Sequence, residues 1–140
     1  MKKIVFICHG NMFRSPIAKA FYNQLAKDGS RAESYGTHVI AQGYQDRKLS
    51  SFLPLKMEFD KLKKYGLDIT NEHCEQLKEE YLKDADKIVV MAEREYIPEW
   101  LNNYKYEYWE GVPNDEFPTN EMILDVIKLI REKVLELINN

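Results

Sequence analysis

Hydrophobic residues follow two alternating patterns along the chain. Uninterrupted apolar runs such as 3–8 and 86–91 are typical of strands buried on both faces of a sheet. Between these runs, apolar residues recur at helical spacing, as Ile17, Phe21 and Leu25 do. Strands separated by helices predict β-α-β units. We therefore expect an α/β fold with a parallel sheet and helices on both of its faces.

The predicted elements fill most of the chain. Strands are expected at 3–8, 32–36, 86–91 and 104–109, the last of them nearer a sheet edge. Helices are expected from Ser15 to Gly29, from Pro54 to Gly66, over 71–82, over 93–102, and from Pro118 to the chain end. No repeat or linker interrupts this order, so residues 1–140 are expected to form a single domain. The long polar segment 37–53 is a candidate functional loop.

Composition and charge exclude several classes of protein. The formal net charge of the 140 residues is -3, which argues against a general nucleic-acid-binding face. Two cysteines do not make a disulfide framework. The apolar run 4–8 is too short for a signal peptide, and no stretch approaches the roughly 18 apolar residues of a membrane span. We expect a cytoplasmic protein with no membrane association and with reduced thiols.

The stretch FICHGNMFRSP, residues 6–16, carries the candidate chemistry. Ligands of parallel α/β sheets bind beyond the carboxyl ends of the strands, where Cys8 lies. The helix expected to begin beside Ser15 favours an anion at its N-terminus. Gly10 and Asn11 suit a tight turn whose backbone amides surround an oxyanion, and the fork of Arg14 matches two phosphate oxygens. The stretch therefore predicts a phosphate-like oxyanion site.

Two interpretations of Cys8 compete. A cysteine at a strand end is often a packed small hydrophobe. A helix start and a nearby arginine instead favour the thiolate form, and the Ser15 hydroxyl is placed to donate to it. Because Arg14 and Ser15 both follow within one short loop, we favour a nucleophile.

The order Cys8-His9-Gly10-Asn11-Met12-Phe13-Arg14-Ser15-Pro16 resembles the phosphate-binding loop of the low-molecular-weight protein tyrosine phosphatase family, Cys-x-Gly-Asn-x-x-Arg-Ser-Pro. Three further segments, 34–37, 65–77 and 84–91, resemble later parts of that family in the same order. The resemblance covers nearly the whole chain. It implies a four-stranded parallel sheet flanked by helices on both faces, with the phosphate-binding loop after the first strand.

The resemblance also implies a reaction. It is a two-step hydrolysis of phosphotyrosine or a similar aryl phosphate monoester, without metal or cofactor, in which Cys8 becomes a phosphocysteine. Phosphotyrosine proteins or small aryl phosphates would be substrates, and phosphate or vanadate would bind the same loop. The implied substrate-binding residues are His9, Gly10, Asn11, Met12, Phe13, Arg14 and Ser15. Asn11 would stabilise the turn and Ser15 the thiolate.

The general acid of the family is an aspartate in an Asp-Pro pair before the last helix, and this chain has no such pair there. Aligned without a gap, the family aspartate falls on Asn114, which cannot donate the proton. Shifted by one residue it falls on Asp115, which we choose, and Glu116 is a third candidate. The alternative is that all three residues only solvate a turn.

Other departures leave alternatives open. Phe13 replaces the second loop cysteine of many family members, so a disulfide within the loop is not available to protect Cys8. Tyr44 and Phe117 either contact a substrate ring or pack against the scaffold. A zinc set can be imagined from Cys8, His9, His73 and Cys74, but adjacent Cys-His pairs lack the usual ligand spacing.

Two further function classes fit the same loop. One is a thioredoxin-coupled arsenate reductase, which relays electrons through two cysteines besides the nucleophile. The other is a non-catalytic oxyanion-binding or regulatory protein that kept the loop and lost the acid.

Overall fold

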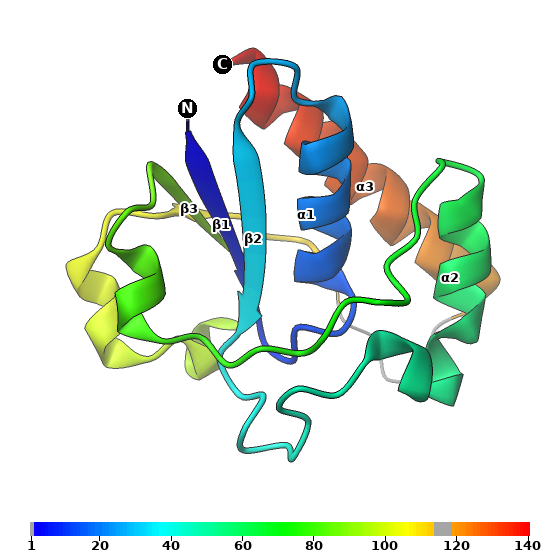
Figure 1. Ribbon diagram of the computed structural model, residues 1–140, viewed down its shortest axis with the longest axis horizontal. Helices are drawn as coiled ribbons and strands as arrows, with labels where there is room; N and C mark the ends of the chain where they lie inside the picture. The colour runs from blue at the N-terminus through cyan, green and yellow to red at the C-terminus, as the bar shows by residue number, and fades with distance from the viewer. Residues whose placement is uncertain (1, 114–118) are drawn as a thin grey trace.

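Four parallel strands form the central sheet of the computed structural model, which describes residues 2–113 and 119–140 (Figure 1). The strands are β1 (Lys3–Cys8), β2 (Arg31–Gly36), β3 (Lys87–Val90) and β4 (Glu107–Tyr108), in the order β2-β1-β3-β4. All neighbouring pairs run parallel, and β4 is a short strand at one edge. The four-stranded parallel sheet expected from the sequence is confirmed.

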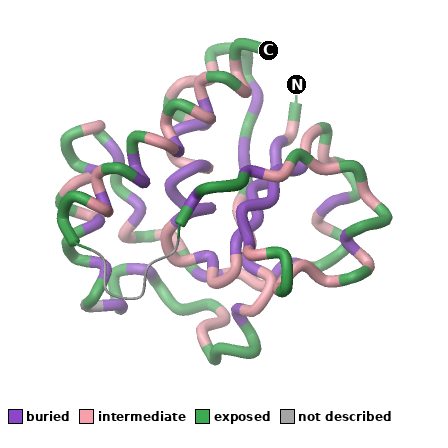
Figure 2. Tube along the Cα trace, turned by 180° about the vertical axis from the view of Figure 1, so that it is seen from behind, coloured by how far each residue is buried: buried purple, intermediate pink, exposed green. Residues whose placement is uncertain are grey.

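The side chains of β1 alternate between two hydrophobic layers. Ile4, Phe6 and Cys8 pack in one layer with α1 (Arg14–Leu25) and α3 (Asn120–Asn139). Val5 and Ile7 pack in the other, which is covered by the short 3-10 helices η3 (Glu79–Leu82) and η5 (Glu99–Asn103). Figure 2 shows the buried strands between these layers. Helices on both faces are thus confirmed, although the face opposite α1 and α3 carries short 3-10 turns.

The helix expected over 71–82 is wrong for most of its length. His73 bridges to Lys48, Gln76 bridges to Gly36, and the Leu77 amide donates to the Gly36 carbonyl over 2.8 Å. These tertiary partners take the backbone groups that a helix would have used within itself, so only η3 remains. The expected helix over 93–102 is divided into η4 (Arg94–Tyr96) and η5, because Pro98 lacks an N–H and caps the second turn.

Gly36 ends β2 directly beside the end of β1, where it pairs with Cys8. A Cβ at this position would lie 2.6 Å from Val39 Cγ2, and 2.9 Å from both the Asn11 nitrogen and the His9 carbonyl oxygen. Two of these atoms are backbone and have little room to move. Glycine therefore lets the loop after β1 approach the end of β2.

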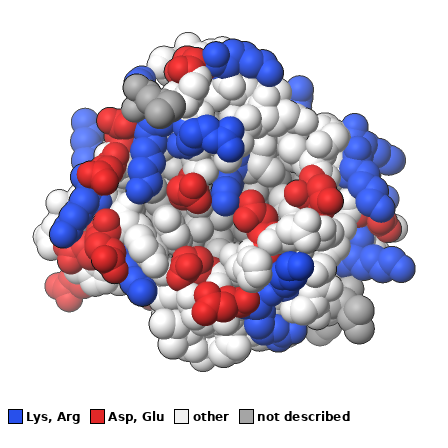
Figure 3. Space-filling model, in the orientation of Figure 1, with Lys and Arg blue, Asp and Glu red and all other residues white. Residues whose placement is uncertain are grey.

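The surface carries mixed charge. On the face drawn in Figure 3, basic and acidic side chains are interspersed. That face gives no support to a basic nucleic-acid-binding surface. Among the described residues, no helix has both the length and the apolar character required to span a bilayer.

The short helix α2 (Lys56–Lys63) packs beside α3.

Candidate active site

Cys8 is the last residue of β1 and lies where the chain turns toward α1. Its side chain is 2% exposed. Its Sγ atom lies 3.3 Å from the Asn11 backbone nitrogen and 3.0 Å from Ser15 Oγ. The sulfur therefore lies between two polar groups at the carboxyl end of β1, the edge at which parallel sheets bind their ligands.

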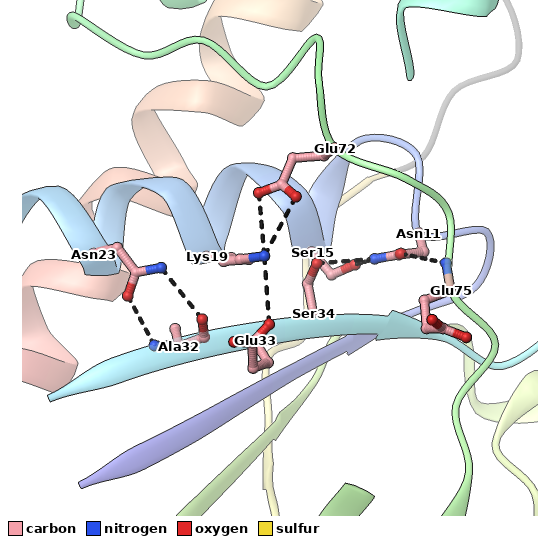
Figure 4. A network of polar contacts seen from close by, with 9 residues as sticks. All are labelled: Asn11, Ser15, Lys19, Asn23, Ala32, Glu33, Ser34, Glu72 and Glu75. Carbon is pink, nitrogen blue, oxygen red and sulfur yellow. Dashed lines mark hydrogen bonds and ion pairs between the residues drawn. The ribbon is translucent and has the colours of Figure 1, made fainter. Parts of the chain in front are cut away.

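Asn11 holds the loop in its turned shape (Figure 4). Its φ of 54° is in the left-handed region, whereas Gly10 is not among the positive-φ residues. Its Oδ1 accepts a 2.9 Å hydrogen bond from the Glu75 amide, which fixes the orientation of the side chain because a backbone N–H can only donate. Its Nδ2 then donates to Ser15 Oγ at 2.9 Å and to Ser34 Oγ at 3.0 Å. Asn11 thus ties the loop to β2 and to the chain before Leu77.

The Ser15 hydroxyl is oriented by this network. Because its oxygen already accepts from Asn11, its single proton is free to be donated. Two acceptors lie nearby, Cys8 Sγ at 3.0 Å and the Tyr35 carbonyl oxygen at 3.5 Å. The shorter contact favours donation to the sulfur. This is the role that the resemblance of the loop implies for Ser15, and it stays a prediction.

Lys19 secures the segment that supplies the Glu75 amide. Its Nζ lies 3.1 Å from Glu72 Oε1 and 3.4 Å from Glu33 Oε2, so α1 is joined both to β2 and to the segment after Thr70 (Figure 4). The Lys19 side chain is 20% exposed, which protects these ion pairs in part from solvent screening. Lys19 therefore acts on the loop indirectly, through the position of residues 72–75.

The start of α1 offers free backbone donors. Phe13 is its N-cap residue and makes no side-chain cap, and its first turn contains no acidic residue. The first-turn amides have no intrahelical partner, and Pro16 has no N–H to satisfy. Together with the positive end of the helix dipole, these amides favour an oxyanion beside Cys8.

Arg14 is held from one side only. Its side chain is 2% exposed, and Nη1 donates to the Met91 carbonyl at 2.7 Å and lies 2.7 Å from Glu93 Oε1. A longer contact of 3.4 Å joins Nη1 to the Val112 carbonyl. Within residues 2–113 and 119–140, neither Nε nor Nη2 has a hydrogen-bonding partner. The guanidinium is thus fixed in place with donors left for a bidentate contact to an oxyanion.

A cavity of about 820 Å³ opens beside Cys8. This volume lies within the range of ligand sites, about 300–1,000 Å³. The loop 37–53 supplies Gln42 and Tyr44 to its wall, and the loop begins by extending the β1–β2 pairing, with the Thr37 amide donating to the Cys8 carbonyl. The functional loop expected from the sequence therefore borders the cavity. Tyr44 also packs edge-to-face on Phe52, as the scaffold interpretation expects, and a contact of its ring with substrate stays a prediction.

Several residues of the cavity lining were not predicted from the sequence, among them Glu58, Glu93 and Tyr96. Tyr96 stacks on the His9 ring with centroids 4.1 Å apart. Glu93 follows the end of β3, and the rule that ligands bind beyond strand ends would have pointed to it. Neither the hydrophobic pattern nor a motif marked the other two.

Burial sets the protonation of two groups near the site. The pKa of His9 is lowered mainly by burial and further by His38 and Arg14, against an opposing effect of Glu93, so the imidazole is neutral at pH 7. Burial, and secondarily the charge of Cys8, raises the pKa of Cys74 to about 11. Cys74 is fully buried and stays a thiol at neutral pH.

The general acid predicted from the sequence, and the second of the two aromatic residues considered for substrate contact, lie outside the described residues. These are Asp115, its alternatives Asn114 and Glu116, and Phe117. On either side of them, Pro113 and Met122 both line the cavity. Thr119 caps α3 by accepting a 3.1 Å hydrogen bond from the Met122 amide. In the described part of the chain, no group of three metal-ligating side chains lies close enough to hold an ion.

Comparisons with known proteins identify a matching family and several proteins of similar sequence or fold. The sequence model of the family described as low molecular weight phosphotyrosine protein phosphatase matches residues 3–99. The low molecular weight protein tyrosine phosphatase of T. tengcongensis superimposes with a TM-score of 0.76 at 25% identity, covering 99% of each chain. Vibrio vulnificus Wzb in complex with benzylphosphonate gives a TM-score of 0.80 at 21% identity, covering 99% of this chain and 97% of Wzb. An arsenate reductase of Staphylococcus aureus (strain Newman) is 25% identical over 138 residues, 94% of each chain.

Proposed function

This chain belongs to the low molecular weight phosphotyrosine protein phosphatase family, and we propose that it hydrolyses phosphotyrosine or similar aryl phosphate monoesters through a phosphocysteine. The observation that carries this proposal is the position of Cys8 Sγ, which accepts a hydrogen bond from the Asn11 amide and lies 3.0 Å from Ser15 Oγ, beside the uncapped start of α1 and the Arg14 guanidinium. We place the reaction in the cytoplasm, where thiols stay reduced.

In the first step, the Cys8 thiolate attacks phosphorus. The bond from Sγ to phosphorus forms, the bond from phosphorus to the aryl oxygen breaks, and that oxygen takes a proton from the Asp115 carboxyl group. Arg14 and the first-turn amides of α1 bind the equatorial oxygens, where charge is spread in the transition state.

In the second step, water attacks the phosphocysteine and the Asp115 carboxylate takes its proton. The bond from phosphorus to Sγ breaks and inorganic phosphate leaves. The Ser15 hydroxyl stabilises the departing thiolate through the 3.0 Å contact already described. The net reaction consumes one aryl phosphate and one water, releases the phenol and inorganic phosphate, and returns Cys8 and Asp115 to their starting states.

Steady-state hydrolysis of 4-nitrophenyl phosphate tests the proposal. We expect turnover that vanadate inhibits competitively, and a phosphorylated enzyme that can be trapped by rapid acid quenching. Mass spectrometry should place the phosphoryl group on the peptide containing Cys8. Absence of turnover with intact phosphate binding would favour the non-catalytic oxyanion-binding alternative.

Replacing Asp115 by asparagine is expected to slow phenyl phosphate hydrolysis by about 10²–10⁴-fold. Phenol is a poor leaving group and needs the proton, whereas 4-nitrophenol leaves without much help. The rate with 4-nitrophenyl phosphate should therefore fall far less in the first step. Rapid-quench measurement of phosphoenzyme formation with both esters checks this. Glu116→Gln is the matched control, and an equal effect on the two esters would show that Asp115 is not the acid.

Arsenate reduction is the second candidate, favoured by curated relatives that are 25% identical over 94% of this chain. The relay of such enzymes uses two cysteines besides the nucleophile, and this chain has only Cys8 and Cys74. Cys74 is buried, and its pKa of about 11 leaves it a poor thiolate. We expect arsenate to inhibit phosphatase turnover competitively and not to be reduced. Sustained arsenite formation with thioredoxin as the electron source would contradict this.

A further inference from the structure

Tyr96 lies on the wall of the cavity beside Cys8, and its ring is half-buried. In the described part of the chain, Tyr96 packs in neither of the two hydrophobic layers. Its neighbour Ile97 packs in the layer covered by η3 and η5, and Tyr44, the other described tyrosine of the wall, packs against the layer of α1 and α3. Packing of the core therefore accounts for Ile97 and Tyr44 but not for the Tyr96 ring.

Two histidines beside the site hold the Tyr96 ring. The His9 ring stacks on it, with centroids 4.1 Å apart and an angle of 28° between the planes. The His38 ring meets it edge-on, with centroids 5.0 Å apart at 69°. The His38 amide donates to the His9 carbonyl over 3.0 Å, which fixes the backbones of the two histidines against each other. The tyrosine ring is thus oriented by the loop that follows the nucleophile.

The turn that carries Tyr96 is joined to the same loop a second time. The Tyr96 amide donates to the Glu93 carbonyl over 2.9 Å, and the Glu93 carboxylate pairs with Arg14 at 2.7 Å. Residues 93–96 therefore contact the loop both at His9, directly after Cys8, and at Arg14. The leaving group of a phosphate ester bound at Cys8 has to extend from the phosphate into the cavity, where the Tyr96 ring forms part of the wall.

This part of the wall is aromatic and uncharged. Burial, more than any nearby charge, lowers the pKa of His9, so a neutral imidazole lies against the tyrosine ring at pH 7. An aromatic group that contacts another ring by its face or edge gains roughly two- to twelvefold in affinity beyond the burial of its area. A saturated group of the same size gains from burial alone. The wall therefore favours an aromatic leaving group.

We infer, on the premise of the phosphatase function proposed above, that Tyr96 is a specificity-determining residue that contacts the aromatic ring of the leaving group. It selects phosphate esters of flat aromatic alcohols over esters of saturated alcohols of the same size. Tyr96 takes no part in bond making or breaking.

Nonhydrolysable phosphonates test this inference by binding alone. Benzylphosphonate carries an aromatic ring, and cyclohexylmethylphosphonate carries a saturated ring of similar size that is at least as apolar. Calorimetric titration of the full chain is expected to show benzylphosphonate binding about fivefold more tightly. Tyr96→Leu should reduce this preference to within about twofold and leave the affinity for inorganic phosphate nearly unchanged. Tyr96→Phe keeps the ring and should keep the preference.

Tyr44→Leu is the matched control, because it removes the other described tyrosine of the same wall. It should keep most of the preference for benzylphosphonate. Loss of the preference in Tyr44→Leu but not in Tyr96→Leu would assign the ring contact to Tyr44 and overturn the inference. An equal loss of affinity for phosphate and both phosphonates in Tyr96→Leu would show that the ring only supports the loop, and would overturn it as well.

Equal affinity of the wild type for the two phosphonates, or an unchanged preference in Tyr96→Leu, would also overturn the inference and leave the phosphatase proposal standing. Failure of phosphate and both phosphonates to bind the wild type would overturn the phosphate site itself, and the inference with it.

Discussion

Replacing Cys8 by serine is expected to lower the rate of aryl phosphate hydrolysis by at least about 10⁴-fold while inorganic phosphate still binds. A serine hydroxyl is a weak nucleophile without an adjacent base, and neither Ser15 nor Asn11 can take its proton. The oxyanion donors come from Arg14 and the start of α1, and the substitution leaves them in place. Turnover of 4-nitrophenyl phosphate and calorimetric titration with phosphate measure the two effects.

The second cysteine supplies the matched control. Cys74→Ala removes the other thiol of the chain from a fully buried position, and we expect activity within a few-fold of the wild type once folding is verified. A Cys8→Ser variant with substantial turnover would exclude a phosphocysteine. Loss of phosphate binding in that variant would show that the serine disturbs the loop and not only the chemistry.

Replacing Arg14 by lysine is expected to lower kcat by about 10²–10³-fold and to weaken phosphate binding as well. Lysine keeps the positive charge but has one nitrogen in place of a planar fork. That nitrogen cannot satisfy the Met91 carbonyl and Glu93 and at the same time give two parallel hydrogen bonds to an oxyanion. Steady-state kinetics with 4-nitrophenyl phosphate and titration with vanadate measure the loss.

Arg94→Lys is the control for this prediction. Arg94 is exposed and pairs with Glu110 at 2.7 Å, so its replacement should leave both quantities nearly unchanged. If Arg14→Lys kept the wild-type rate, the point charge alone would be sufficient and a bidentate contact would have no role. Thermal unfolding of Arg14→Lys and Arg94→Lys checks their folding. If both variants lose the same amount of thermal stability, misfolding is excluded as the cause of a difference in their rates.

The fold could be predicted from the sequence because its signals are local. The continuous apolar runs 3–8 and 86–91 mark buried strands whatever surrounds them, and the helix-period segments between the predicted strands are long enough for the crossovers that parallel strands need. The expectation over 71–82 failed for the opposite reason. The backbone partners of that segment lie in β2 and in the loop after it, and no local pattern reports such partners.

The candidate site divides in the same way. One short loop contains Cys8, Asn11, Arg14 and Ser15. Their spacing alone brings them together at the start of a helix, so the sequence by itself determined this part of the site. Only the tertiary structure decided what holds and buries them: the Glu75 amide donates to Asn11, Glu93 pairs with Arg14, and Cys8 and Arg14 are each 2% exposed. These contacts join residues far apart in the chain, and burial is a property of the folded surroundings, so neither is written in a local pattern of side chains.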